Sequence, residues 1–179
     1  LVIDEAGQFS LADAVAVSQC ASGLLLLGDP QQLASPSMAV HPPGAGVSVL
    51  EHMLDGAATI PADRGIFLDE TWRMHPSITR VVSSLMYDDR LGSVQACGQQ
   101  RLVAPAPYGG AGLLWCPVRH EGNSAASIEE ARVVSRIIYD LVVTSRVDPA
   151  GAERPIDVGD VLVVAPYTAH IGLLKRLLP

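Results

Sequence analysis

Residues 23–28 read Gly-Leu-Leu-Leu-Leu-Gly, four apolar side chains in a row between two glycines. A strand without polar alternation suits a parallel sheet, because helices cover such a sheet on both faces. Residues 1–5, Leu-Val-Ile-Asp-Glu, form a second apolar run that ends in two acids. Between the two runs, residues 10–20 carry apolar positions at helical spacing after a capping Ser10. This alternation predicts an α/β fold with parallel sheets flanked by helices.

The rest of the chain continues the same alternation. Pro76 is well placed as the first residue of a helix, and Ser127 precedes two glutamates at the spacing of a capping box. Expected strands cover residues 66–68, 113–116 and 161–165, and expected helices cover residues 49–54, 76–87, 127–143 and 169–178. Residues 93–112 and 144–159 are expected to be irregular. Residues 56–65 have no apolar period and are the best candidate for a linker.

Composition excludes several classes of protein. Of the 179 residues, 49% are hydrophobic and 17% charged, which supplies a core and excludes a disordered chain. No apolar run approaches the roughly 18 residues that cross a bilayer, so we expect no membrane partner. The net charge of −7 disfavours a broad nucleic-acid-coating surface but leaves room for a narrow groove. The three cysteines are widely spaced, which favours a reducing, cytoplasmic location.

Three short segments carry residue types suited to nucleotide chemistry. Asp4 and Glu5 end an apolar strand, where open α/β sheets bind ligands, and paired carboxylates can hold Mg²⁺ and activate water. Residues 28–33, Gly-Asp-Pro-Gln-Gln-Leu, follow the next strand and bring the amide of Gln32 to the same edge. Arg73 lies at a strand-to-helix junction beyond the linker, where an arginine can reach phosphates held elsewhere.

Each segment also has a structural interpretation. Acids at a strand end often cap the following helix, and Gly-Asp-Pro often closes a strand as a turn. An arginine at a junction is ordinarily a surface charge, and Trp72 is ordinarily a core residue. For any one segment the structural interpretation is preferred, so the functional interpretation depends on finding all three in order.

Together the segments resemble one family. Residues 4–8 (Asp-Glu-Ala-Gly-Gln), the Gly-Asp-Pro-Gln-Gln-Leu segment and residues 72–76 (Trp-Arg-Met-His-Pro) are similar to boxes of superfamily-one helicases of the nonsense-mediated-decay helicase-like branch. Residues 163–167, Val-Val-Ala-Pro-Tyr, resemble the family's next box. The resemblance implies parts of two RecA-like P-loop NTPase domains. Residues 1–65 would be the C-terminal part of the first domain with the linker, and residues 66–179 the N-terminal part of the second.

The resemblance implies catalytic roles around ATP. Asp4 would bind Mg²⁺, Glu5 would be the catalytic base, and Gln8 would be a coupling residue near the nucleotide. Gln32 and Arg73 would meet the γ-phosphate. The residues expected to be catalytic are therefore Glu5, Gln32 and Arg73.

The resemblance implies binding roles for a further set. Gly28 and Asp29 would lie at the nucleotide, and Trp72 would stack near the adenine. Pro166 and Tyr167 would lie beside single-stranded DNA or RNA, which such proteins hold through the backbone and aromatic faces.

Some positions carry no implied role, and one motif is missing. His170 stands where the family often has Gln, and Gly7 occupies a variable position, so neither receives a role. The only lysine, Lys175, lies outside any Gly-x-x-x-x-Gly-Lys-Ser/Thr pattern, so residues 1–179 contain no P-loop.

The expected function of the parent protein is that of an ATP-dependent helicase or translocase on single-stranded nucleic acid, with ATP hydrolysed between two RecA-like domains. A P-loop is expected upstream of Leu1, and residues 1–179 alone are expected to be inactive. The stretch from Gly65 looks most like bacterial members that carry a RecB-like nuclease domain in the same chain. The alternative is a motor-derived nucleic-acid-binding or scaffolding module without ATP turnover. The choice between DNA and RNA stays open.

Overall fold

A computed structural model describes residues 1–32, 40–42 and 44–178. Leu33, the last residue of the Gly-Asp-Pro-Gln-Gln-Leu segment (the second box, residues 28–33), lies outside the described residues. The chain divides into two compact units. Unit 1 comprises residues 1–69 and 80–92, and unit 2 comprises residues 70–79 and 93–179. Among the described residues, no helix is both long enough and apolar enough to cross a membrane.

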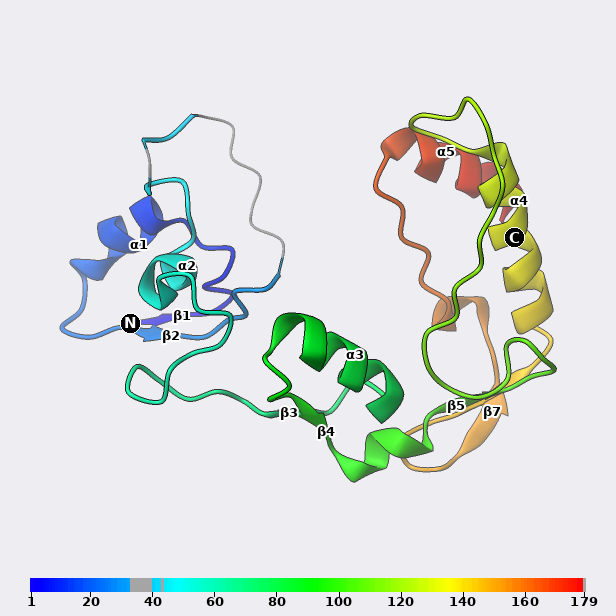
Figure 1. Cartoon of the computed structure of the whole chain (residues 1–179), viewed down its shortest axis with the longest axis horizontal. Coiled ribbons are helices and arrows are strands. Elements are labelled where there is room, and N and C mark those ends of the chain that lie inside the picture. Colours follow the sequence, from blue (N-terminus) through cyan, green and yellow to red (C-terminus); the bar gives the residue numbers. More distant parts are fainter. Residues whose placement is uncertain (33–39, 43, 179) are drawn as a thin grey trace. The chain divides into compact units, whose positions relative to one another are not determined.

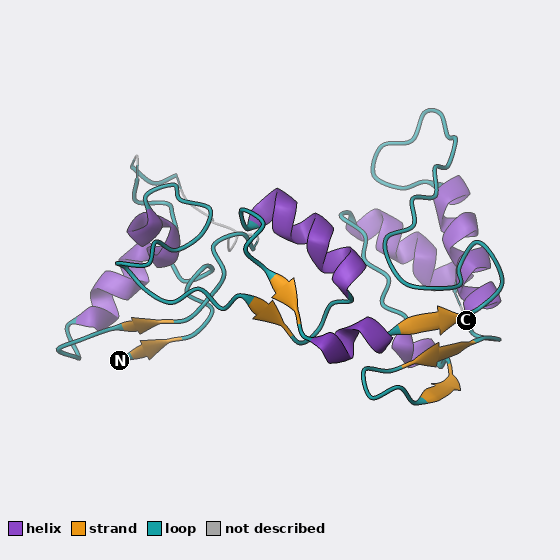
Figure 2. Cartoon of the chain, turned by 60° about the horizontal axis from the view of Figure 1, so that its bottom comes forward, coloured by secondary structure: helices purple, strands orange, loops and turns teal. Residues whose placement is uncertain are grey.

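Unit 1 contains a parallel pair of short strands, β1 (Val2–Ile3) and β2 (Leu25–Leu26). Ile3 lies opposite Leu26 in the register, and Figure 2 shows the two strands side by side. Both strands are shorter than the apolar runs that predict them. The parallel pairing predicted from those runs is confirmed.

Two capped helices accompany the parallel pair: α1 (Leu11–Ser18) and α2 (Val49–Leu54). Each helix follows a serine whose hydroxyl accepts a backbone N–H of the first turn, Ser10 at 3.0 Å and Ser48 at 3.1 Å. The buried core of unit 1 consists of Ile3, Ala6, Ala14, Val49, Leu50 and Leu54. Both helices form where the sequence predicts them; the Ser10 cap is expected from the sequence, whereas the Ser48 cap is seen only in the structure.

Helix α3 (Pro76–Met86) begins in unit 2 and ends in unit 1. Pro76 is its first residue, as predicted, because proline has no N–H to leave unpaired there. The helix is flanked by two paired strands, β3 (Glu70–Thr71) and β4 (Gly92–Ser93).

Unit 2 contains a three-stranded antiparallel sheet in the order β5 (Arg101–Val103), β6 (Ser145–Val147) and β7 (Glu153–Pro155). Arg146 lies opposite Leu102 on one side and opposite Arg154 on the other. The prediction of parallel sheets and irregular chain is wrong for this part of unit 2. Strands of three residues are too short to show a hydrophobic period in the sequence.

Helices α4 (Ile128–Leu141) and α5 (Thr168–Leu177) pack against each other in unit 2 (Figure 1). The predicted cap is present, because the Ser127 hydroxyl accepts the Glu130 N–H at 3.1 Å. Ser135 Oγ donates to the Leu177 carbonyl oxygen at 3.0 Å and links the two helices. Two short 3-10 helices, η1 (Gln95–Gln99) and η2 (Val158–Asp160), complete the elements assigned in the described residues.

Three predicted strands, residues 66–68, 113–116 and 161–165, form no ladder within the described residues. Their apolar side chains are largely exposed, with Ile66 at 86% and Leu162 at 87%. An apolar run becomes a strand only when a neighbouring strand supplies hydrogen-bond partners. No other described segment pairs with these three runs, so the prediction of strands there is wrong.

Candidate functional site

The ends of β1 and β2 bring the first two boxes together in unit 1. Asp4 and Glu5 follow β1. Gly28 and Asp29 come shortly after β2. Because parallel strands end at the same edge of a sheet, these residues share that edge. The Ala6 N–H donates across to the chain after β2 at 2.8 Å and fixes the alignment.

Glu5 has a backbone conformation that L-residues rarely adopt, with φ at 52°. A left-handed residue other than glycine costs roughly 1–3 kcal/mol. Two hydrogen bonds hold it: Glu5 N–H donates to Asp4 Oδ1 at 2.9 Å, and Gln8 N–H donates to the Glu5 carbonyl oxygen at 2.8 Å. The Glu5 residue is exposed. Strained, exposed residues of this kind cluster at functional sites.

Gly7 and Gly28 allow the two boxes to approach closely. A Cβ on Gly28 would lie 2.7 Å from the Ala6 nitrogen, and a Cβ on Gly7 would lie 2.2 Å from the Asp29 carbonyl oxygen. Side-chain atoms do not come this close to backbone, so any larger residue at either position would push the boxes apart. The sequence predicts no role for Gly7, because the close approach becomes visible only in three dimensions.

Gln8 and Gln32 meet across the two boxes. Gln8 Nε2 donates to Gln32 Oε1 at 3.3 Å, and both residues are exposed. This contact completes one patch in unit 1 that contains six of the predicted site residues, Asp4, Glu5, Gln8, Gly28, Asp29 and Gln32. Among the described residues, no three His, Cys, Asp or Glu side chains gather as a ready-made metal cluster.

Asp29 is held by two donors. Its Oδ1 accepts the Gln31 N–H at 2.9 Å, and its Oδ2 accepts the Tyr87 hydroxyl at 2.6 Å. Burial, and then the hydrogen bond and charge of Asp29, raise the pKa of Tyr87 to about 12, so the hydroxyl remains a donor at neutral pH. Sequence reasoning missed Tyr87, because an aromatic residue at the end of a helix carries no signal beyond packing.

Trp72 and Arg73 lie in unit 2, between β3 and α3. Trp72 is 77% exposed, which contradicts the core interpretation of this residue. The Arg73 N–H donates to Thr71 Oγ1 at 3.2 Å, and within the described residues its exposed guanidinium forms no ion pair. An exposed indole beside an unpaired guanidinium favours binding over packing for both side chains.

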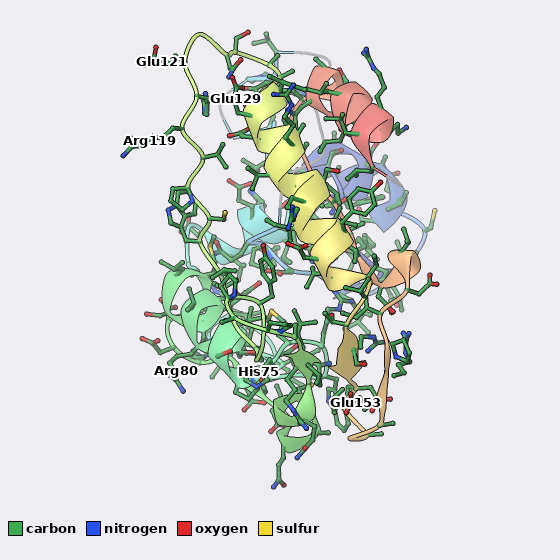
Figure 3. The ribbon with its side chains drawn as sticks, turned by 90° about the vertical axis from the view of Figure 1, so that its right-hand side faces the viewer. His75, Arg80, Arg119, Glu121, Glu129 and Glu153 are labelled. Atoms are coloured by element: carbon green, nitrogen blue, oxygen red, sulfur yellow. The ribbon has the colours of Figure 1, made fainter. Side chains whose placement is uncertain are left out.

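His75 secures the start of α3, where Figure 3 labels it. Its Nδ1 accepts the Ser77 N–H at 3.1 Å and lies 2.7 Å from Ser77 Oγ. The residue also lines a cavity of about 550 Å³ within unit 2, together with Leu114 and Arg146. Trp72 and Tyr167 are not in that lining, so the cavity is separate from the predicted binding residues.

Pro166 and Tyr167 precede α5 and are exposed, Tyr167 by 54%. The Tyr167 carbonyl oxygen accepts the His170 N–H at 3.0 Å in the first turn. His170 is buried, and its Nδ1 accepts the Ser127 N–H at 3.1 Å. His170 therefore joins α5 to the start of α4, whereas Tyr167 remains about half exposed.

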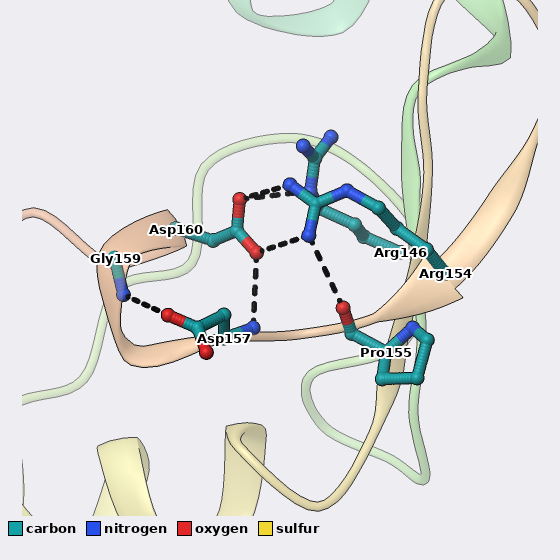
Figure 4. A network of polar contacts seen from close by, with 6 residues as sticks. All are labelled: Arg146, Arg154, Pro155, Asp157, Gly159 and Asp160. Carbon is teal, nitrogen blue, oxygen red and sulfur yellow. Dashed lines mark hydrogen bonds and ion pairs between the residues drawn. The ribbon is translucent and has the colours of Figure 1, made fainter.

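Unit 2 also holds a charged cluster that the sequence did not predict (Figure 4). Arg154 Nη2 donates to Asp160 Oδ1 at 2.5 Å, and Arg146 Nε lies 3.2 Å from the same oxygen. The Arg146 contact is an ion pair without hydrogen-bond alignment within the described residues. Hydrogen bonds from Arg154 and from the Asp157 backbone lower the pKa of Asp160 to about 2. The Asp160 carboxylate thus offsets the repulsion between Arg146 and Arg154, which lie opposite each other on neighbouring strands.

Comparison with protein families settles the broader identity. A family model described as an AAA domain matches residues 45–179. The chain belongs to the AAA domain family. This AAA domain is typical of superfamily-one helicases, has a RecA-like fold and generally uses ATP and Mg²⁺. The match includes the Trp72 and Tyr167 boxes, whereas the first two boxes precede it. No curated protein and no solved structure matches the chain.

Proposed function

We propose that the chain is the middle portion of an ATP-dependent helicase or translocase motor on single-stranded nucleic acid, whose P-loop lies outside residues 1–179. The AAA domain supports the class of protein. The observation that carries the proposal is the Gln8–Gln32 contact at 3.3 Å, next to the strained and exposed Glu5. A carboxylate and two amides gathered at one sheet edge are suited to orienting and deprotonating a water molecule.

The patch in unit 1 contains carboxylates and amides that could supply part of the contacts that Mg²⁺ and ATP require, and the P-loop contacts would come from outside residues 1–179. Asp4 would hold Mg²⁺, since this hard cation prefers carboxylate oxygens and water. Bound Mg²⁺ would supply positive charge against the phosphates. Glu5 would accept the proton of the attacking water, and the amides of Gln8 and Gln32 would orient it and read the γ-phosphate. Gly28 shapes the turn that brings these groups together.

Unit 2 would supply the remaining contacts. The exposed ring of Trp72 would stack near the adenine, and Arg73 would stabilise charge on the γ-phosphate as an arginine finger does. Pro166 and Tyr167 would contact the single strand, since exposed aromatic rings stack on bases of any sequence. In this proposal ATP is shared between two RecA-like domains formed by residues 1–65 and 66–179 with their flanking sequence.

Glu5→Gln in the natural protein that contains this chain tests the proposal. The amide keeps the shape of the side chain but cannot take a proton, so turnover should fall by roughly 10²- to 10⁴-fold while ATP binding persists. Glu51→Gln, on α2 of the same unit, is the matched control and should keep wild-type turnover. Turnover near wild type in Glu5→Gln would show that Glu5 is not the base.

A second candidate is a motor-derived binding or scaffolding module without ATP turnover, favoured by the absence of a P-loop pattern in residues 1–179. A Gly-Lys-Ser or Gly-Lys-Thr sequence upstream of Leu1 in the gene would favour the motor. Binding of single-stranded nucleic acid without stimulated ATP hydrolysis by the natural protein would favour the module.

A further inference from the structure

Two contacts tie the turn of the second box to the rest of unit 1. The Tyr87 hydroxyl donates to Asp29 Oδ2 at 2.6 Å, and Gln31 Nε2 donates to the Ala58 carbonyl oxygen at 3.1 Å. The other oxygen of Asp29 accepts the Gln31 N–H and closes the turn from within. The Asp29 carboxylate therefore accepts one hydrogen bond from Tyr87 and one from within the turn. The orientation of the turn thus depends on where Tyr87 holds Asp29.

Tyr87 is itself anchored by side chains of unit 1. Its ring lies 6.2 Å from the Phe67 ring, tilted by 51°. The Arg90 guanidinium stacks 4.4 Å from the centre of the same Phe67 ring and donates to Thr59 Oγ1 at 2.7 Å. Buried Thr59 donates in turn to Asp88 Oδ2 at 3.1 Å. The Tyr87 ring is therefore held in place by Phe67, and Phe67 is in turn held by Arg90.

The hydrogen bond from the Tyr87 hydroxyl to the Asp29 carboxylate is of a strong and persistent kind. A hydrogen bond to an ionised carboxylate is about twice as strong as a bond between neutral groups. Burial and Asp29 raise the pKa of Tyr87 to about 12, so the phenol keeps its proton across the neutral range. The donor is therefore present whenever the protein is folded near neutral pH.

We infer that Tyr87 is a positioning residue, which orients the turn of residues 29–32 so that the Gln32 amide faces Gln8. The inference rests on the proposed function, because the role of Gln32 toward phosphate belongs to that proposal. Without the hydroxyl, the Asp29 carboxylate can rotate and the turn can relax. Gln32 is then displaced although no group that touches the nucleotide is removed.

Tyr87→Phe in the natural protein is the test, with Tyr139→Phe as the matched control. Phenylalanine keeps the ring against Phe67 and removes only the hydroxyl. Tyr139 lies on α4 in unit 2, is 52% exposed and makes none of the contacts of this network. Because small displacements of positioned groups lower rates strongly, kcat should fall about 10-fold in Tyr87→Phe. The KM for ATP should change less than about 2-fold, and Tyr139→Phe should keep both constants.

Hydrogen exchange supplies a measurement that does not depend on turnover. The backbone amides of Gly28, Asp29, Gln31 and Gln32 should exchange faster in Tyr87→Phe than in wild type, whereas exchange in Tyr139→Phe should match wild type. Exchange unchanged in Tyr87→Phe would overturn the inference. Unchanged kcat in a protein that hydrolyses ATP would also overturn it, and so would a loss of kcat fully explained by a smaller folded fraction.

Absence of ATP turnover in the wild type would overturn the proposed function instead. The exchange of residues 28–32 would then decide by itself whether Tyr87 orders the turn. Faster exchange in Tyr87→Phe would support the positioning of the turn, and unchanged exchange would contradict it.

Discussion

Gly28 is a residue at which unit 1 has no room for a side chain. A Cβ there would lie 2.7 Å from the Ala6 nitrogen. Gly28→Ala should therefore lower the free energy of unfolding by about 1–3 kcal/mol, the range for overpacking. Gly23→Ala is the matched control, because nothing lies within 4 Å of a Cβ at Gly23. Urea unfolding of both variants checks the prediction, and equal effects on stability would contradict the close approach of the two boxes.

Arg73 tests the chemistry expected of unit 2. Its guanidinium is exposed and forms no ion pair among the described residues, so we expect its removal to leave folding largely unchanged. Arg73→Ala in the natural protein should lower kcat by up to about 10³-fold, with modest change in ATP affinity. Arg73→Lys should rescue only part of the activity, since lysine lacks the planar fork.

Arg80→Ala, an exposed position on α3, is the matched control for Arg73. Steady-state kinetics, nucleotide affinity and melting temperature are measured on the same preparations. A fall in melting temperature large enough to explain the lost activity of Arg73→Ala would make Arg73 a structural residue.

The residues of the candidate site divide by how they can be found. Asp4, Glu5 and Gln32 follow apolar runs, so their shared sheet edge is predictable from sequence pattern and parallel pairing. The left-handed φ of Glu5 is a conformation that glutamate rarely adopts, so the residue type does not indicate it. The contact of Tyr87 with Asp29 joins segments far apart in the chain, and such a contact leaves no local signature in the sequence.

The sheet of unit 2 carries a prediction about acid stability. Hydrogen bonds from Arg154 and from the Asp157 backbone lower the pKa of Asp160 from 3.8 to about 2. A carboxyl whose pKa is lower in the folded state stabilises the fold above its unfolded pKa and loses that contribution as the pH falls. The stability of the wild type should therefore drop between about pH 4 and pH 2 through this group.

Asp160→Asn removes that pH dependence. The variant should be less stable than wild type at pH 7, and the gap should close as the pH approaches 2. Urea unfolding midpoints across this range give the comparison, with Asp63→Asn, an exposed aspartate of unit 1, as the control. A constant gap from pH 7 to pH 2 would show that Arg154 and Arg146 do not act through the charge of Asp160.

Helices were more predictable than strands for a physical reason. Ser10, Ser48 and Ser127 mark helix starts because a hydroxyl caps local N–H groups, and such bonds form within four residues. A strand instead requires a partner from elsewhere in the chain. The apolar runs at residues 113–116 and 161–165 lack one among the described residues, while polar segments such as β7 found partners.

At the scale of the whole chain, ATP hydrolysis by the proposed motor requires a P-loop, which residues 1–179 do not contain. No Gly-x-x-x-x-Gly-Lys-Ser/Thr sequence is present to cradle the β- and γ-phosphates. A polypeptide of these residues alone should therefore show no ATP turnover, with or without single-stranded nucleic acid. Phosphate release by a clean preparation measures this, using the Glu5→Gln variant as background. Turnover above that background would contradict the proposal of a motor completed by sequence elsewhere.

Helix α3 has a consequence for anyone who divides this protein genetically. A cut after residue 65 follows the boundary expected from the sequence, yet residues 80–92, which belong to unit 1, would travel with the second piece. The first piece would keep Asp29 and lose Tyr87, and the second would keep Tyr87 without its acceptor. The two pieces are therefore candidates for fragment complementation, in which unit 1 is assembled only when both are present, and not for independent expression.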